Sequence, residues 1–185
     1  MRAVQLVMGG EPRRFVQIWV SEGTGEWVRR EGIVGRTGRI TEFGLAADAS
    51  SAAELAAPYL ADGFTEVDDD LRAWIVVQYP TRDKRSDERL IDHATAWLAA
   101  VLDERGLGYV DGYDRGKRGG DGRLVVNLYA RVVDAAAGCE AAMAALRKGR
   151  ADERRATVAH RPPDGEEWTV RYARTSGMLP GDFSI

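Results

Sequence analysis

The sequence predicts an α+β protein of two domains, with an antiparallel sheet and one helix in the N-terminal half and an α/β sandwich in the C-terminal half. Short runs rich in β-branched and aromatic residues alternate with three runs of helical character. Each half carries its own set of strands and amphipathic helices, as a separate core requires. Three adjacent aspartates at 68–70 repel one another and suit an exposed junction. We therefore expect domains at residues 1–67 and 72–185.

The composition is that of an ordinary soluble globular protein. Of the 185 residues, 44% are hydrophobic and 30% are charged. No apolar run approaches the ~20 residues that cross a bilayer, and the apolar N-terminal stretch is too short for a signal peptide. The single cysteine, Cys139, excludes an internal disulfide and fits a reducing compartment. We expect a cytoplasmic protein in which Cys139 is a small buried thiol.

The N-terminal half begins with an expected lead-in at residues 1–12, which ends in a Gly-Gly-Glu-Pro breaker cluster. The β-branched and aromatic runs that follow are typical of strands. These expected strands are residues 15–20, 26–34 and 40–43. Between the last two, Gly35 and Gly38 are the positions where the backbone most easily adopts a positive φ.

A helix is expected at residues 51–62. Ser51 and Glu54 have the spacing of a capping box, in which each side chain accepts from the other residue's amide. Leu55 and Tyr59 then lie one turn apart and face the sheet. Pro58 lies inside this run and is expected to kink or split the helix.

The C-terminal half predicts the order β-α-β-β-α-β with one extra strand. The expected strands are residues 74–79, 109–110, 124–129, 156–159 and 168–172, and the expected helices are 86–106 and 133–148. We expect Trp74 and Leu98, and likewise Trp19 of the N-terminal half, to be largely buried, because each lies in an apolar strand or on the apolar stripe of a helix. This order fits a ferredoxin-like sandwich, with both helices on one face and the first and third strands central. The half also loosely resembles small uncharacterised bacterial ferredoxin-like proteins, a likeness that implies no activity. Residues 111–122 are expected to form a solvated loop, since their glycine and lysine spacing does not match a phosphate-binding loop.

Residues 13–67 carry a second resemblance. Arg36-Thr37-Gly38 in the turn and Gly63-Phe64 after the helix match the pattern of the WGR domain, a module that accompanies some poly(ADP-ribose) polymerases and many bacterial proteins. Where that family has Trp-Gly-Arg, this chain has Glu31-Gly32-Ile33. The resemblance implies a WGR-like antiparallel sheet with one helix. In the polymerases the tripeptide region meets DNA, whereas Glu31 repels phosphate.

The charge distribution leaves two kinds of partner open. Residues 27–40 hold four arginines and one acidic residue, and residues 41–70 hold eight acidic residues with no lysine or arginine. The possible nucleic-acid-binding residues are Arg29, Arg30, Arg36 and Arg39, because arginine matches phosphate oxygens. Their alternative role is to keep the hairpin soluble and to prevent its strands from pairing with another chain. We favour a protein-interaction or regulatory module that uses the sheet faces and the acidic segment, with weak, sequence-independent nucleic-acid binding as the alternative.

No arrangement of residues indicates catalysis. His93 and His160 lie far apart, with no cysteine or acidic spacing typical of zinc. No nucleophile-histidine-acid set or pair of carboxylates stands out. We therefore expect a non-enzymatic protein with no metal, no cofactor and no membrane-spanning segment; an enzyme with an irregular site is a third hypothesis.

Overall fold

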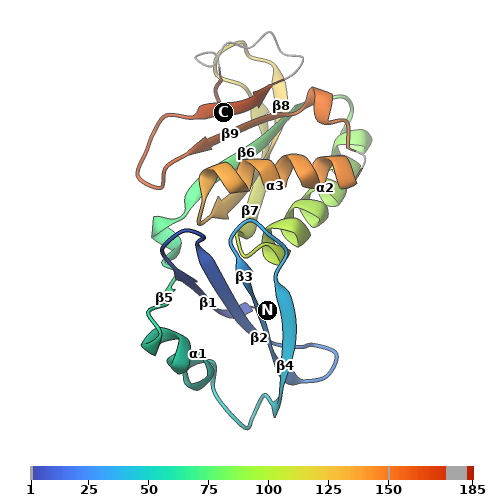
Figure 1. Ribbon diagram of the computed structural model, residues 1–185. Coiled ribbons are helices and arrows are strands. Elements are labelled where there is room, and N and C mark those ends of the chain that lie inside the picture. The colour runs from blue at the N-terminus through green and yellow to red at the C-terminus, as the bar shows by residue number, and fades with distance from the viewer. Residues whose placement is uncertain (1, 150, 174–182) are drawn as a thin grey trace. The chain divides into compact units, whose positions relative to one another are not determined.

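The computed structural model describes residues 2–149, 151–173 and 183–185 (Figure 1). The fold is α+β, with two separate antiparallel sheets of five strands each. The chain divides into two compact units, Met1–Asp68 with Glu104–Gly106, and Asp69–Asp103 with Leu107–Ile185. The first change of unit falls inside the aspartate run at 68–70. The short return of residues 104–106 to the first unit has no counterpart in the expected domain boundaries.

The first unit is a meander of strands with one helix. Its strands are β1 (Arg2–Met8), β2 (Arg14–Val20), β3 (Glu26–Ile33), β4 (Arg39–Ala46) and β5 (Thr65–Glu66), in the order β4-β3-β2-β1-β5. The expected lead-in at 1–12 is wrong, because residues 2–8 form β1 between β2 and β5. Its alternation of Val4, Leu6 and Met8 places three apolar side chains against the core of this unit.

Helix α1 (Ala52–Ala61) covers one face of this sheet. Ser51 is its N-cap and forms the predicted capping box with Glu54. Leu55 and Tyr59 pack against the core, as their spacing predicts. The helix continues through Pro58 and is not split, so the loss of one backbone hydrogen bond at the proline is tolerated.

The second unit follows the predicted order of elements. It contains β6 (Ala73–Pro80), α2 (Lys84–Glu104, whose last residue belongs to the first unit), β7 (Gly108–Lys117), β8 (Leu124–Val132), α3 (Ala135–Lys148), β9 (Thr157–Arg161) and β10 (Thr169–Ala173). Two short 3-10 helices are η1 (Asp69–Leu71) and η2 (Glu153–Arg155). The strand order is β10-β9-β6-β8-β7, so the first and third strands of the βαββαβ run lie side by side inside the sheet.

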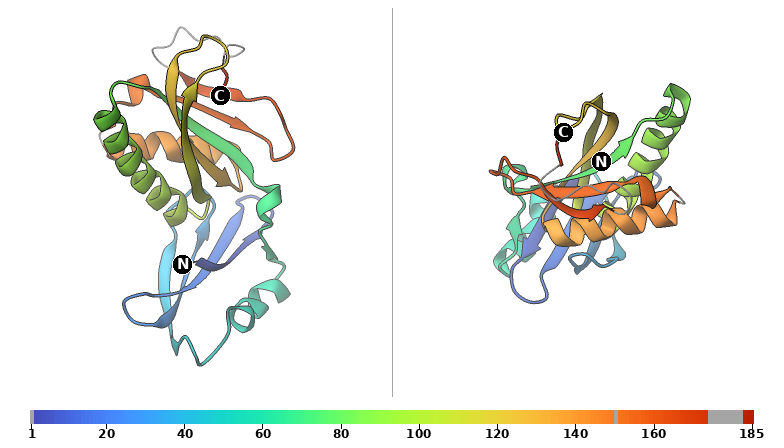
Figure 2. Two further views of the ribbon diagram at one scale, coloured as in Figure 1. Left: turned by 180° about the vertical axis from the view of Figure 1, so that it is seen from behind. Right: turned by 90° about the horizontal axis from the view of Figure 1, so that it is seen from above.

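Helices α2 and α3 cover one face of the second sheet, and no helix of the described residues lies on the other face (Figure 2). Ile75 and Leu128 are fully buried on the helix side, and Leu98 of α2 packs there, as predicted. Gly138 lets α3 approach closely, since a Cβ at that position would lie 2.9 Å from Val132 Cγ2.

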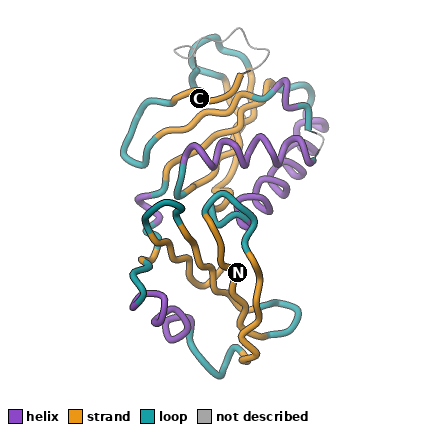
Figure 3. The backbone as a smooth tube through the Cα atoms, viewed as in Figure 1, coloured by secondary structure: helices purple, strands orange, loops and turns teal. Residues whose placement is uncertain are grey.

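Two local predictions in this unit are wrong. The expected loop at 111–122 is mostly strand, because β7 pairs with β8 as far as Lys117 opposite Leu124 (Figure 3). Glycines at an edge position do not prevent pairing when the neighbouring strand supplies the register. Helix α2 begins at Lys84 instead of Ser86, and Asp83 caps it by accepting from the Ser86 amide at 3.0 Å.

Candidate functional site

The arginines of the predicted turn do not form one patch. Arg29 and Arg30 are neighbours in β3, so their side chains leave the sheet on opposite faces. Arg29 Nη1 donates to the Tyr59 hydroxyl at 2.6 Å. Arg30 is only 8% exposed and donates from Nη1 to Gln17 Oε1 at 3.2 Å. Both guanidinium groups are thus held by the first unit itself.

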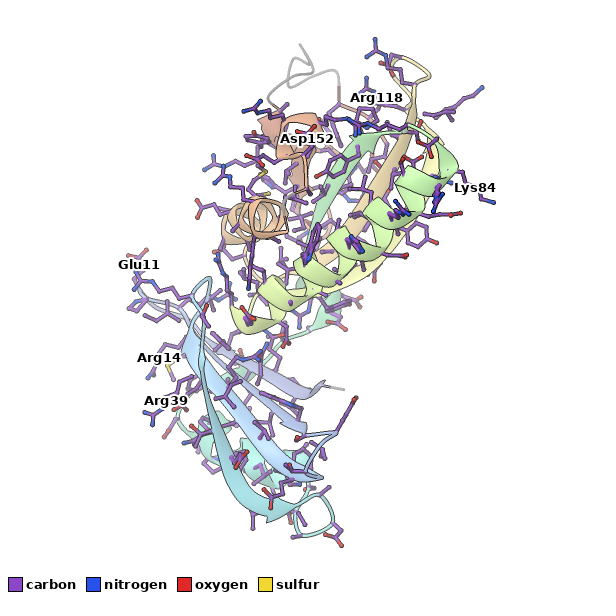
Figure 4. All side chains as sticks on the ribbon, turned by 90° about the vertical axis from the view of Figure 1, so that its right-hand side faces the viewer. Glu11, Arg14, Arg39, Lys84, Arg118 and Asp152 are labelled. Atoms are coloured by element: carbon purple, nitrogen blue, oxygen red, sulfur yellow. The ribbon has the colours of Figure 1, made fainter. Side chains whose placement is uncertain are left out.

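Arg36 and Arg39 are exposed, and Arg39 projects away from the ribbon in Figure 4. The turn that contains Arg36 depends on two glycines, Gly35 and Gly38, in different ways. Gly35 has the predicted positive φ, at 87°. Gly38 does not; instead, a Cβ there would lie 2.7 Å from Phe15 Cζ, so this position needs glycine for close packing.

A second cluster of arginine and aromatic side chains lies on the helix-free face of the second sheet. Trp74 of β6 is directly opposite Arg131 of β8 on one side and Arg161 of β9 on the other. The Arg131 guanidinium carbon lies 4.2 Å from the centroid of the Trp74 ring, and that of Arg161 lies 5.5 Å from it. Tyr129 meets Trp74 edge-on at 6.3 Å. These distances are those of cation–π and T-shaped aromatic contacts.

The cluster continues to both edges of the sheet. Arg161 also lies 5.0 Å from the ring of Trp168, just before β10. On the other side, Tyr109 of β7 is opposite Arg131, and the guanidinium of Arg72 lies 5.5 Å from its ring. We call this surface the aromatic-arginine face. It consists of Arg72, Trp74, Tyr109, Tyr129, Arg131, Arg161 and Trp168.

A hydrogen-bonded network fixes one of these rings. The Tyr129 hydroxyl donates to Asp114 Oδ2 at 2.8 Å, and Asn127 Nδ2 donates to Asp114 Oδ1 at 2.7 Å. Burial, with the hydrogen bond to Asp114, raises the pKa of Tyr129. The hydrogen bond to Asp114 holds the Tyr129 ring in one orientation beside Trp74.

The arginines of this face differ in how far the protein satisfies them. Arg131 donates to the carbonyl of Asp69, and Arg72 pairs with the Asp69 carboxylate at 2.6 Å. In contrast, Arg161 Nε is buried and has no hydrogen-bond partner among the described residues. A donor left in this state gains most from an acceptor supplied by a ligand.

The aromatic-arginine face is absent from the features predicted from the sequence, although the chain carries a signal for it. Trp74 was expected to be largely buried in an apolar strand, but it is half-buried on the helix-free side; Trp19, expected to be buried, is likewise half-buried. The signal is the alternation Arg72-x-Trp74 and Tyr129-x-Arg131, since residues two apart in a strand share a face. Only the pairing of β6 with β8 brings the two pairs together.

The described part of the chain also contains titratable and thiol side chains outside this face. Its His, Cys, Asp and Glu residues form no group of three or more that could hold a metal ion. Cys139 is 1% exposed, and burial raises the pKa of its thiol to about 12. Among the helices described, none combines the length and apolar character needed to span a membrane.

Comparison with protein-family models, with curated proteins and with solved structures finds no match to this chain.

Proposed function

We propose that this chain is a non-enzymatic binding protein whose second unit binds single-stranded nucleic acid on the aromatic-arginine face. The observation that carries the proposal is the position of Trp74 and Tyr129. They lie on neighbouring inner strands and on the same face, and the guanidinium groups of Arg131 and Arg161 flank Trp74. None of the helices in the described part of the chain covers this face (Figure 2).

The chemistry of the face suits an unpaired strand better than a duplex. Bases of a single strand can stack on aromatic rings, which contributes about 1–3 kcal/mol per base, whereas duplex bases are already stacked. Arginine adds planar donors for phosphate oxygens, and Arg161 Nε is a buried donor without a partner among the described residues. RNA-recognition modules use aromatic rings on a four-stranded sheet in this way.

We further propose a ferredoxin-like arrangement for the second unit. The order β9-β6-β8-β7, with α2 and α3 as crossovers, supports it. For the first unit we propose a degenerate WGR-like module, since β2, β3 and β4 precede α1 and the Gly63-Phe64 pair as that resemblance implies. A bacterial, cytoplasmic setting is part of this proposal.

A titration of labelled oligonucleotides tests the main proposal. We expect the full chain to bind a ~12-nucleotide single strand more tightly than the matched duplex at ~50 mM salt, where electrostatic contacts are strong. Arg131→Gln with Arg161→Gln should weaken this binding at least tenfold, because both guanidinium groups flank Trp74. Fluorescence anisotropy measures the affinities.

Arg123→Gln is the matched control, because Arg123 is an arginine of the same unit whose side chain is 75% exposed and lies outside the face. It should bind as the wild type does. Wild-type protein that binds neither oligonucleotide, or a double variant that binds as well as Arg123→Gln, would contradict the proposal.

A protein partner is the second candidate function, favoured by the edge strand β4. Ile40 and Leu45 of β4 are 54% and 39% exposed, and β4 has β3 as its only neighbour in the sheet among the described residues. An extended peptide can add to such an edge through backbone hydrogen bonds and seat its side chains on the apolar residues. Ile40→Lys with Leu45→Lys should abolish capture of a partner by the immobilised protein; unchanged capture would exclude this edge.

A further inference from the structure

A pocket of about 220 Å³ lies within the second unit, between the first half of α2 and the segment around η2. Tyr79, at the end of β6, lines it, so the pocket is on the helix side of the sheet. Figure 4 looks onto α2 and labels Asp152, another of the residues that line the pocket. Its volume is below the ~300–1,000 Å³ typical of sites for drug-sized ligands, so its occupant is small.

The hydroxyl of Tyr79 is an unsatisfied donor beside this space. The whole side chain is 0% exposed, and its hydroxyl has no hydrogen-bond partner among the described residues. Such buried hydroxyl groups are rare in folded proteins and call for a partner. Burial raises the pKa of Tyr79, and the nearby Asp152 carboxylate acts in the same direction. The hydroxyl therefore remains protonated and can donate a hydrogen bond to an acceptor.

Positive charge surrounds the same space. Arg82 and Arg89 have exposed side chains and form no salt bridge among the described residues. Arg155 is anchored, since its Nη2 donates to the Pro80 carbonyl at 2.8 Å. The buried carboxylate of Asp87 is already occupied, because Arg115 donates to its Oδ2 at 2.8 Å and the Arg82 amide donates to its Oδ1 at 3.1 Å.

One side of the pocket is apolar. Leu90 and Trp97 line it, and the Trp97 ring lies 5.5 Å from that of His93 at an angle of 50°. Asp152 is the exposed carboxylate of the lining and opposes an anion. A ligand that fits both sides therefore combines a compact negative head with a short apolar or aromatic part.

We infer that this pocket binds a small organic oxyanion, a phosphate or a carboxylate, whose head accepts from the Tyr79 hydroxyl and pairs with Arg82 and Arg155 while its apolar part packs on Trp97. The site is independent of the aromatic-arginine face, because the two lie on opposite faces of the second sheet and share no residue. The second unit would then bind a small molecule in this pocket in addition to the single-stranded nucleic acid proposed for the aromatic-arginine face.

Calorimetry with three probes tests the inference on the full chain. Phenyl phosphate and benzoate carry the two alternative heads on the same ring, and inorganic phosphate carries a head alone. We expect one of the ring-bearing probes to bind and to change Trp97 fluorescence, with inorganic phosphate weaker. The comparison of phenyl phosphate with benzoate identifies the head.

Tyr79→Phe is the decisive variant, because it removes only the hydroxyl. It should lower the affinity for the probe that binds about tenfold or more, as expected for the loss of a hydrogen bond to a charged group. It should also leave the melting temperature of the free protein unchanged or higher, since an unsatisfied buried hydroxyl is lost. Tyr113→Phe, at a tyrosine that is 59% exposed and outside the pocket, is the control and should change neither quantity.

Two further variants test the charges. Arg82→Gln should lower the affinity for the probe, and Asp152→Asn should raise this affinity because it removes a repulsive carboxylate. No binding of any probe at millimolar concentration would overturn the inference. So would a Tyr79→Phe variant that binds as the wild type does, because the hydroxyl would then be satisfied by water alone.

Discussion

At the scale of single residues, Gly106 shows how strongly close packing selects the sequence of the first unit. Its φ is +61°, and a Cβ built on it would overlap the ring of Phe15, which is fully buried. Its carbonyl also accepts from Gln5 Nε2 at 2.8 Å. From the sequence alone Gly106 is only the predicted end of a helix, because the aromatic ring that packs on it comes from a strand 91 residues earlier.

Gly106→Ala is therefore expected to lower the free energy of unfolding by about 2–4 kcal/mol, from a strained left-handed backbone and an overpacked ring. Urea denaturation measures this change. Gly112→Ala is the matched control, since Gly112 has no positive φ and open space at its Cβ, and its effect should stay within about 0.5 kcal/mol. Equal midpoints for the two variants would show that Phe15 moves aside without cost.

At the scale of elements, α1 depends on its capping box because it contains a proline. Ser51 Oγ accepts from the Glu54 amide at 3.2 Å, and the Ser51 amide donates to Glu54 Oε2 at 2.7 Å. Ser51→Ala should therefore cost about 1 kcal/mol of stability, as measured by thermal or urea unfolding. Ala53→Ser, a change inside the same helix that leaves the cap intact, should cost less.

The same box predicts a pH dependence. Hydrogen bonds from the Ser51 amide and from the hydroxyls of Ser50 and Ser51 lower the pKa of Glu54 below its ordinary value of 4.5. A carboxyl group with a lowered folded-state pKa stabilises the fold above its unfolded pKa, and this contribution is lost as pH falls through the folded value. The stability difference between wild type and Glu54→Gln, measured by urea unfolding, should thus be largest above pH 4.5 and shrink in more acidic solution. A difference that is constant with pH would exclude this role.

Elements were predictable from sequence where the pattern was local. The order of elements in the second half, the capping box at Ser51 and the burial of Leu98 all follow from spacing within one segment. The length of β7 could not be predicted from local spacing, because it depends on pairing with β8 across a glycine-rich hairpin. The aromatic-arginine face and the pocket at Tyr79 could not be predicted for the same reason. Trp74 and Arg131 come together only through strand pairing, and Tyr79 and Arg155 only through the tertiary fold.

At the scale of the whole molecule, a net charge of −3 coexists with two separate concentrations of arginine. One is the exposed pair Arg36 and Arg39 in the first unit, and the other is the aromatic-arginine face of the second. Binding of a polyanion depends on such local concentrations more than on the net charge. The two surfaces differ in chemistry, because the turn offers charge alone and the face offers charge with aromatic rings.

This difference separates the two surfaces by the form of nucleic acid that each would bind. Binding by the turn would be weak, blind to sequence and strongly salt-dependent, because it rests on phosphate contacts alone. Arg36→Ala with Arg39→Ala should then reduce the affinity for nicked or intact duplex DNA and leave the single-strand affinity unchanged; both residues are exposed, so the fold should survive. Arg131→Gln with Arg161→Gln should give the reverse result in the same anisotropy titrations.

A variant that restores the Trp-Gly-Arg tripeptide of the WGR resemblance is a second test of duplex binding by the turn. Glu31→Trp with Ile33→Arg removes a carboxylate 3.9 Å from Arg29 Nε and adds a stacking ring and a cation beside the exposed arginines. If the turn meets DNA as the resemblance implies, this variant should bind a nicked duplex more tightly than the wild type, with a steeper loss of affinity between ~50 and ~200 mM salt. Ile33 is half-buried, so urea unfolding must first show a folded variant. A stable variant with no gain in duplex affinity would leave the aromatic-arginine face as the proposed nucleic-acid surface.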